Sequence, residues 1–147
     1  MIRPAHPADA DWARALVRRA YALYVPRMGQ EPAPMLADYG ALIEEGEVRV
    51  LEEDSKPVAL IVLRPDGDAL FVENIAVDPE AQRKGHGRML LAFAEREARR
   101  LGLTAIRLYT NAAMIENLSY YPRLGFRETD RREEEGYKRV FFEKSLG

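Results

Sequence analysis

The sequence contains no cysteine and only two histidines among its 147 residues. Without cysteine the chain cannot form disulfides, thiolate metal sites or a cysteine nucleophile, and this lack fits a reducing compartment, so we expect a cytoplasmic protein. His6 and His86 lie far apart in the sequence, so we expect no metal site. No apolar run approaches the roughly 20 residues of a membrane span, and the N-terminus lacks a signal-peptide core, so we expect no membrane partner.

The chain also lacks an excess of charge of either sign. Its 22 lysines and arginines stand against 24 acidic residues, giving a net charge of −2 and a pI of about 5.8. A general nucleic-acid surface needs a basic excess, so we expect no nucleic-acid partner. The composition is otherwise that of a folded protein, with 47% hydrophobic residues. With no repeat, low-complexity tract or long linker, we expect a single domain over residues 1–147.

Hydrophobic periodicity predicts alternating strands and helices in the order βαα-βββ-α-β-α-ββ. In the first helix Trp12, Leu16, Ala20 and Leu23 share one face, and we expect Pro26 to end it. Further helices are expected over residues 35–43, 90–101 and 112–121. Strands are expected over residues 1–4, 48–51, 58–64, 69–77, 104–110, 126–132 and 137–144. This order indicates an α/β (α+β) domain, a mixed sheet with helices on both faces.

The segment from Asn74 to Arg88 holds the pattern that indicates chemistry. The strand-like Ile75-Ala76-Val77 leads through a short turn into Gln82-Arg83-Lys84-Gly85-His86-Gly87-Arg88 and then into a helix. Glycines let backbone N–H groups approach a phosphate, and the helix N-terminus adds partial positive charge. The pattern matches neither the nucleotide P-loop nor the dinucleotide fingerprint. From these residues alone, a phosphate-binding loop and a basic helix start without a ligand both stay open.

The loop resembles the acyl-CoA pyrophosphate loop of the GNAT family of N-acetyltransferases, which reads Gln/Arg-x-x-Gly-x-Gly/Ala. A second signature of that family is similar to Tyr121-Pro122-Arg123-Leu124-Gly125-Phe126, and the element order is similar over essentially the whole chain. The resemblance implies the GNAT fold, a mostly antiparallel sheet of six to seven strands in which strands four and five splay apart. It also implies an N-acetyltransferase that uses acetyl-CoA as its cosubstrate.

The resemblance implies where the cofactor would bind. Backbone groups of strand four would pair with the pantetheine arm, and backbone amides of the loop would hold the pyrophosphate. The family often has an asparagine seven residues before the tyrosine of its second signature, where this sequence has Met114, so we assign that contact to Asn117 instead. The predicted cofactor contacts are Ile75, Ala76, Val77, Gln82, Arg83, Lys84, Gly85, His86, Gly87, Arg88 and Asn117.

Acetyl transfer needs two proton movements, because a lysine-like amine with a pKa of about 10.4 must lose a proton before it attacks. The resemblance implies that Tyr121 is the acid that protonates the departing thiolate; a packing tyrosine at a helix end is the alternative. For the base we favour Glu73, a carboxylate inside an apolar strand. The alternative is that Glu73 faces solvent or pairs with an arginine. Asp78 is a weaker candidate for the base.

The acceptor side is predicted from the first two helices and their connection, which with the last hairpin form the acceptor groove in this family. We predict substrate contacts from Tyr21, Tyr24, Arg27 and Tyr39, with ordinary helix packing as the alternative for each. The acidic run 133–135 favours either a cationic acceptor or plain solvated surface.

We predict a small-molecule primary amine as the acceptor. A protein N-terminus or lysine, a catalytically inactive CoA-binding module and an interaction domain stay as alternatives. Strand edges and the apolar run Val140-Phe141-Phe142 are compatible with a homodimer.

Overall fold

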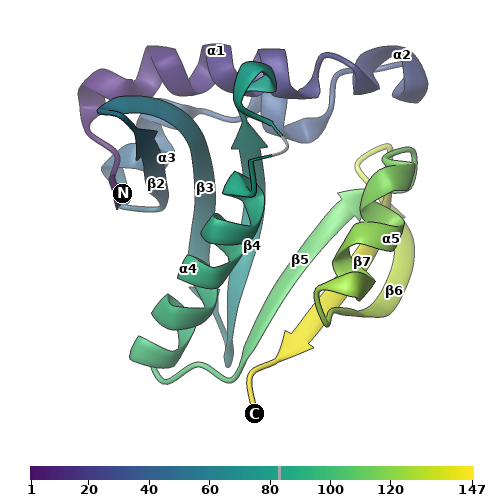
Figure 1. Ribbon diagram of the computed structural model, residues 1–147. Helices are drawn as coiled ribbons and strands as arrows, with labels where there is room; N and C mark the ends of the chain where they lie inside the picture. The colour runs from purple at the N-terminus through teal and green to yellow at the C-terminus, as the bar shows by residue number, and fades with distance from the viewer. Residues whose placement is uncertain (83) are drawn as a thin grey trace. The chain divides into compact units, whose positions relative to one another are not determined.

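The structure is a computed structural model that describes residues 1–82 and 84–147 (Figure 1). Its strands are β1 (Ile2–Pro4), β2 (Val48–Glu53), β3 (Lys56–Asp66), β4 (Ala69–Val77), β5 (Ala105–Asn111), β6 (Arg127–Glu134) and β7 (Tyr137–Ser145). Its α-helices are α1 (Ala10–Tyr21), α2 (Tyr24–Met28), α3 (Tyr39–Glu44), α4 (His86–Arg100) and α5 (Ile115–Arg123). Three short 3-10 helices are η1 (Pro7–Asp9), η2 (Ala33–Leu36) and η3 (Pro79–Ala81).

The strands form one seven-stranded sheet in the order β1-β2-β3-β4-β5-β7-β6. Strands β4 and β5 pair in parallel, whereas β1 with β2, β2 with β3, β5 with β7 and β6 with β7 pair antiparallel. The mixed, mostly antiparallel sheet of the sequence prediction is therefore confirmed. The described β4–β5 ladder joins Ala69–Val72 to Ala105–Leu108, although β4 continues to Val77 and β5 to Asn111.

Contacts divide the chain into two compact units. The first unit comprises Met1–Leu63 and Asn74–Phe93, and the second comprises Arg64–Glu73 and Ala94–Gly147. The single domain expected from the sequence stays a prediction, and each unit is described by itself.

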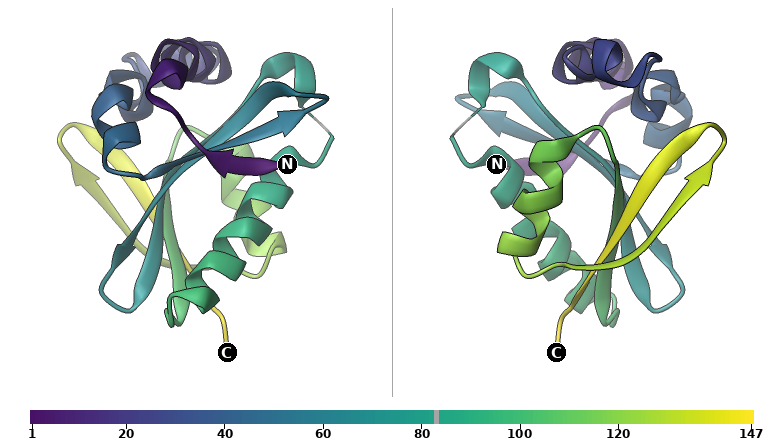
Figure 2. Two further views of the ribbon diagram at one scale, coloured as in Figure 1. Left: turned by 90° about the vertical axis from the view of Figure 1, so that its left-hand side faces the viewer. Right: turned by 90° about the vertical axis from the view of Figure 1, so that its right-hand side faces the viewer.

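The first unit is built around the buried face of α1. Ala13, Leu16 and Val17 recur at helical spacing and are fully buried, as a core-facing stripe requires. Helices α1 and α3 cover one face of β2 and β3, and the start of α4 covers the other (Figure 2). The core cluster also contains Met35, Tyr39, Ile43, Val48, Leu60, Val62 and Ala76.

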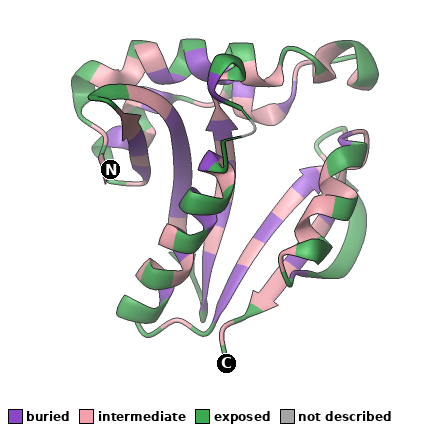
Figure 3. Cartoon of the chain, in the orientation of Figure 1, coloured by how far each residue is buried: buried purple, intermediate pink, exposed green. Residues whose placement is uncertain are grey.

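The second unit packs α5 against the antiparallel ribbon of β5 and β7. The Tyr121 ring of α5 contacts Phe126 edge to face with ring centroids 5.6 Å apart, and its centroid lies 5.7 Å from that of Phe142. From Ile106 to the end of β5, buried residues alternate with half-buried ones (Figure 3). Strand β6 is the last strand in the sheet order and is exposed along nearly all its length; its many charged side chains discourage pairing with another chain.

Three local expectations need correction. Pro26 does not end the first helix: α1 ends at Tyr21, and Pro26 lies in the first turn of α2, where its missing N–H has no intrahelical acceptor. The second helical pattern is split into η2 and α3, because the Asp38 carboxylate accepts a 3.1 Å hydrogen bond from the Ala41 N–H and starts a new helix.

The third correction concerns β2 and β3, which extend further and meet in a tight hairpin. Its central residues, Asp54 and Ser55, both have positive φ, +52° and +64°. Two-residue hairpins favour this conformation because its twist matches the strands, and aspartate tolerates it better than most residues. The sequence signal was weak because the turn contains neither glycine nor asparagine.

Gly125 offers a test of the second unit's packing. Its φ is +95°, and a Cβ there would lie 3.2 Å from Lys144 Cε, while Lys144 Nζ bonds Glu95 at 3.0 Å. We expect Gly125→Ala to lower the free energy of unfolding by about 1–2 kcal/mol from backbone strain, plus the cost of displacing Lys144. Urea unfolding followed by circular dichroism measures the change.

Gly136→Ala is the matched control, since φ there is +83° and no described atom lies within 4 Å of a Cβ. In a Lys144→Ala background the two glycine substitutions should cost the same. If the extra cost of Gly125→Ala survived in that background, the Lys144 contact would not be its cause.

Candidate functional site

The end of β4 is fixed by Asp78, the weaker base candidate. Its carboxylate accepts a hydrogen bond from the Glu80 N–H at 3.0 Å and forms an ion pair with Arg19 at 2.9 Å. Its own N–H donates to the Val58 carbonyl at 2.8 Å. Asp78 therefore caps η3 and pins the strand end, the turn-forming role that Asp-Pro after a strand favours.

The loop between η3 and α4 has the backbone that a phosphate site needs. Gly85 adopts φ of +80°, and no described atom lies within 4 Å of a Cβ built there. Its carbonyl accepts from the Met89 N–H at 3.0 Å, so the 15-residue helix α4 starts directly at the loop. The partial positive charge of a helix N-terminus and the accessible amides around a left-handed glycine together suit an anion.

The side chains of this loop vary in exposure. Gln82, Lys84 and Arg88 are exposed, and Gln82 Nε2 lies 3.4 Å from the Val77 carbonyl. Lys84 Nζ lies 3.5 Å from Glu53 Oε1. The prediction for Arg83 falls outside the described residues. Exposed cationic side chains beside a backbone anion site fit the pyrophosphate of acetyl-CoA.

His86, also predicted to contact the cofactor, is instead turned inward. Its side chain is 4% exposed, with Nδ1 3.0 Å from the Ala81 carbonyl and Nε2 3.0 Å from Glu53 Oε2. The hydrogen bond from His86, aided by Lys84, holds the pKa of the Glu53 carboxyl below its usual value. The His86 side chain is therefore unavailable to a cofactor, and only the backbone of His86 could contact one.

A buried amide ties the predicted acceptor residues to β4. Asn74 is 5% exposed, and its Oδ1 lies 2.6 Å from the Tyr21 hydroxyl, which is also 3.0 Å from the Ile75 carbonyl. Asn74 Nδ2 donates to the Tyr39 hydroxyl at 2.9 Å, and that hydroxyl donates to the Pro34 carbonyl at 2.6 Å. Sequence reasoning missed Asn74, although a lone amide in an apolar strand was a usable signal.

The other acceptor residues continue outward from this network. The Tyr24 ring lies 6.1 Å from the Tyr21 ring, and the Arg27 guanidinium lies 5.3 Å from the Tyr24 centroid. Tyr39 is 1% exposed, so it supports Asn74 and offers no surface to an acceptor. The structure thus brings the four predicted residues together, with Tyr21, Tyr24 and Arg27 left as candidates for direct contact.

In the second unit, Glu73 is paired with an arginine. Arg64 donates to Glu73 Oε1 at 2.7 Å, and its guanidinium lies 5.1 Å from the Phe71 centroid. Phe71 stacks on Tyr109 at 5.8 Å, and Tyr109 contacts Phe141 at 5.6 Å. Burial raises the pKa of Tyr109, with Arg139 opposing and Glu73 adding to that shift. Glu73 therefore lies beside an aromatic row, with an arginine as its partner.

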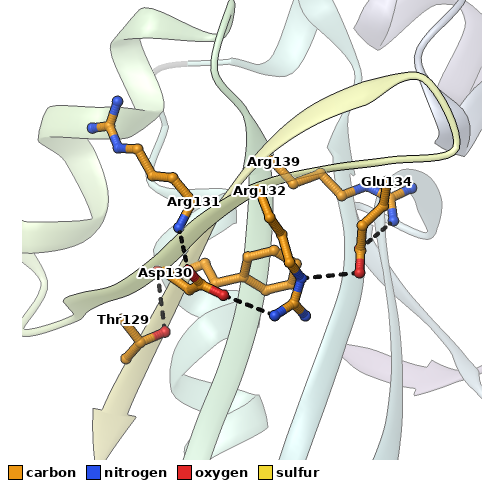
Figure 4. A network of polar contacts seen from close by, with 7 residues as sticks. Thr129, Asp130, Arg131, Arg132, Glu134 and Arg139 are labelled. Carbon is orange, nitrogen blue, oxygen red and sulfur yellow. Dashed lines mark hydrogen bonds and ion pairs between the residues drawn. The ribbon is translucent and has the colours of Figure 1, made fainter.

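The acidic run of the last hairpin is partly neutralised by arginines (Figure 4). Arg132 bonds Asp130 at 2.8 Å and Glu134 at 3.0 Å, and Arg139 bonds Glu134 at 3.0 Å. The Arg139 hydrogen bond is the main reason that the pKa of Glu134 lies below its usual value. The charge of Glu134 is thus paired with arginines of the same hairpin. This pairing weakens the prediction that the acidic run attracts a cationic acceptor.

Helix α5 carries Tyr121 and Asn117. The Tyr121 carbonyl accepts from the Phe126 N–H at 3.1 Å, which ties the helix end to the following turn. Asn117 Nδ2 donates to Thr110 Oγ1 at 3.0 Å, so its amide is anchored to β5. Catalytic and cofactor roles for these two residues stay predictions.

Two absences hold across the described part of the chain. Residues 1–82 and 84–147 contain no group of three or more His, Asp or Glu side chains placed to hold a metal ion. Within the same residues, no helix has both the length and the apolar character needed to cross a membrane.

These features agree with a match over most of the chain to one family model. Residues 12–126 match the model described as the acetyltransferase (GNAT) family. The chain belongs to the GNAT family of acetyltransferases. The family resemblance read from the two sequence signatures is therefore confirmed.

Among curated proteins, GNAT relatives match about half of the chain. It is 34% identical over 67 residues to YvbK, an uncharacterised N-acetyltransferase of Bacillus subtilis, covering 46% of this chain and 43% of YvbK. It is 35% identical over 78 residues to the ribosomal protein bS18-alanine N-acetyltransferase of Salmonella typhimurium, covering 53% of each. The chain thus spans about half the length of the curated relatives it matches.

Solved GNAT structures share the fold across nearly the whole chain. PaiA N-acetyltransferase of Thermoplasma acidophilum, solved with coenzyme A, superposes with a TM-score of 0.82 at 19% identity, covering 99% of this chain and 98% of that one. The S18-alanine N-acetyltransferase of Escherichia coli gives a TM-score of 0.79 at 22% identity, covering 99% and 93%. At these identities the comparison establishes the fold, and the predicted GNAT fold is confirmed.

The buried amide network predicts a specific stability loss. Tyr39→Phe removes the hydroxyl that accepts from Asn74 and donates to Pro34. We expect the free energy of unfolding to fall by about 1–3 kcal/mol, since buried polar groups then lose that partner. Thermal and urea unfolding measure it. Leu36→Ala is the control, because Leu36 is 63% exposed on the neighbouring η2; an equal loss there would rule out the hydrogen bonds as the cause.

Proposed function

We propose that this GNAT-family chain transfers the acetyl group of acetyl-CoA to a primary amine. The observation that carries the proposal is the path from β4 through Gly85 into α4. A left-handed glycine with φ of +80° at the start of a 15-residue helix provides amides and partial positive charge for a pyrophosphate. Lys84 and Arg88, both exposed, add full charges.

The backbone of β4 would hold the pantetheine arm. The described ladder to β5 stops at Val72, five residues before β4 ends at Val77, so Ile75, Ala76 and Val77 are the positions for such pairing. The Ile75 carbonyl already lies 3.0 Å from the Tyr21 hydroxyl. A carbonyl oxygen has two lone pairs, so it can accept a second hydrogen bond from an amide of the cofactor.

Acetyl-CoA would supply the acetyl group as a thioester, whose C–S bond breaks as the C–N bond to the amine forms. Glu73 accepts the proton that the amine nitrogen must lose, directly or through water. The Tyr121 hydroxyl, with a usual pKa of about 10, donates a proton to the departing sulfur. An amine that starts as an ammonium ion loses two protons from nitrogen, one before the attack and one as the amide forms. One proton reaches the sulfur through Tyr121, which is then reprotonated, and the other is released to solvent.

We propose a small-molecule primary amine as the acceptor, with Tyr21, Tyr24 and Arg27 as its contacts. The contacts among these three side chains support this choice, because the Arg27 guanidinium lies over the Tyr24 ring and the Tyr24 ring lies in tilted contact with the Tyr21 ring. A protein N-terminus is the second candidate, favoured by the relatives named as bS18-alanine N-acetyltransferases. A cytoplasmic location and a homodimer remain predictions.

The first test is release of free thiol from acetyl-CoA in the presence of amines, amino acids and peptides with a free N-terminal alanine. We expect turnover with one of these classes and a fall in kcat of about 100-fold or more in Tyr121→Phe, the typical size of a lost general acid. Tyr120→Phe, whose ring contacts Tyr121 at 5.4 Å, is the control and should retain activity.

Calorimetric titration with CoA distinguishes an enzyme from a CoA-binding module and from an interaction domain. Tight CoA binding without turnover on any acceptor would show that the chain is a CoA-binding module and not an enzyme. If CoA does not bind at all, the proposal is overturned. Turnover with alanine-terminated peptides alone would select the protein N-terminus as acceptor.

A second substitution tests the proposed base. Glu73→Gln should lower kcat by about 100-fold while CoA binding is retained. Glu143→Gln is the matched control, because Glu143 pairs with Arg107 at 2.7 Å in the same unit, as Glu73 does with Arg64. Equal losses in both variants would assign Glu73 to an ion pair that supports the fold.

A further inference from the structure

The Asn74 side chain lies between two tyrosine hydroxyls of the first unit. Its Oδ1 lies 2.6 Å from the Tyr21 hydroxyl, and its Nδ2 lies 2.9 Å from the Tyr39 hydroxyl. The Tyr39 hydroxyl in turn lies 2.6 Å from the Pro34 carbonyl. A hydroxyl has a single proton to donate, and an amide side chain has one donating and one accepting end. The four groups therefore form a line of hydrogen bonds with a definite direction.

The Pro34 carbonyl sets that direction. A carbonyl offers no proton, so the Tyr39 proton lies toward Pro34 and the Tyr39 oxygen accepts from Asn74. The end of the amide that faces Tyr39 is therefore its NH₂ group. The distances agree: the two 2.6 Å contacts join oxygen to oxygen and the 2.9 Å contact joins nitrogen to oxygen, the usual order of O–H···O and N–H···O lengths.

The Tyr21 hydroxyl is left with one possible role toward Asn74. The amide oxygen that faces it only accepts, so Tyr21 donates its single proton across the 2.6 Å contact. The same hydroxyl lies 3.0 Å from the Ile75 carbonyl, which therefore receives at most a weak share of that proton. A buried amide, 5% exposed, thus controls how strongly a backbone carbonyl of β4 is engaged by a neighbouring side chain.

We propose that Asn74 is a positioning residue that holds the Tyr21 proton away from the Ile75 carbonyl, so that this carbonyl accepts a full hydrogen bond from an amide N–H of acetyl-CoA. This inference rests on the proposed function, in which the end of β4 pairs with the pantetheine arm. Without the Asn74 amide, the Tyr21 hydroxyl turns to the Ile75 carbonyl, its other near acceptor. Two donors then compete for the partial negative charge of one oxygen, and the bond to the cofactor weakens.

Carbon NMR of the Ile75 carbonyl tests the direction of the proton without any ligand. Ile75-Ala76 is the only isoleucine–alanine pair in the sequence, so carbonyl-labelled isoleucine combined with nitrogen-labelled alanine isolates this one signal. A carbonyl carbon moves to higher chemical shift as its oxygen accepts a stronger hydrogen bond. We expect Asn74→Leu to move the signal in that direction, and to leave it in place when Tyr21→Phe is also present. An unmoved signal in folded Asn74→Leu would overturn the inference.

Tyr39→Phe guards against an Asn74 variant that fails to fold. It removes the hydroxyl that fixes the amide, so the amide gains a bond by turning its NH₂ group to the Tyr21 oxygen, which sends the Tyr21 proton to Ile75. We expect the Ile75 carbonyl signal to move in the same direction as in Asn74→Leu. If it stays in place in folded Tyr39→Phe, the directed line of hydrogen bonds is wrong and the inference is overturned.

Calorimetric titration with CoA tests the consequence for binding. We expect Asn74→Leu to weaken CoA binding by about two- to tenfold, the range that follows from the net contribution of one hydrogen bond. In a Tyr21→Phe background the same substitution should change the affinity little, because no hydroxyl proton is left to redirect. Equal losses in both backgrounds would show that Asn74 only supports the fold, and a carbonyl shift without any change in affinity would overturn the link to the cofactor.

Failure of this inference is distinguishable from failure of the proposed function. If the wild-type protein binds CoA and the folded Asn74→Leu variant binds it equally well, the inference alone is overturned. If the wild-type protein binds no CoA, the proposed function is overturned together with the cofactor part of the inference. The carbonyl signal of the ligand-free protein then still decides whether Asn74 directs the Tyr21 proton.

Discussion

The arrangement of the first unit depends on one buried amide. Asn74 lies in the interior, where an unpaired polar group is costly, and its partners come from three separate segments: Tyr21 of α1, Tyr39 of α3 and, through Tyr39, the Pro34 carbonyl of η2. Satisfying this side chain holds those segments against β4. The strand that the amide fixes is the one that leads toward the proposed cofactor loop, so the proposed acceptor residues and the proposed cofactor backbone share a single support.

The loop itself illustrates how a GNAT chain can present an anion site with few dedicated side chains. Gly85 supplies the left-handed turn, and α4 supplies the partial positive charge of its N-terminus. The motif histidine is directed into the protein, where it connects η3, β2 and α4. In the proposed site the His86 side chain supports the loop from inside, and only its backbone stays available to a cofactor.

Arginines give the second unit much of its local order. Arg64, Arg132 and Arg139 each lie over an aromatic ring and bond a carboxylate at the same time. A planar guanidinium can do both because its face stacks while its edge donates. Such pairs make a carboxylate in a strand ambiguous in function, since the Arg64 contact that would orient Glu73 as a base is also an ordinary ion pair between neighbouring strand residues. Kinetics of matched variants, rather than geometry, separates the two.

The sequence by itself indicated the family, the order of the strands and the position of the proposed cofactor loop, because glycine spacing and hydrophobic periodicity can be read along the chain without any tertiary contact. It also placed the tyrosines and Arg27 near the proposed acceptor side. It could not show that Pro26 lies in the first turn of α2, that Glu53 is the last residue of β2 before a tight turn, or that the Asn74 side chain joins Tyr21 to Tyr39. Those facts depend on which distant groups satisfy one another's hydrogen bonds. Only the tertiary structure decided that His86 turns away from the loop surface, since its partner Glu53 lies on a different strand and nothing in the spacing of the motif records that contact.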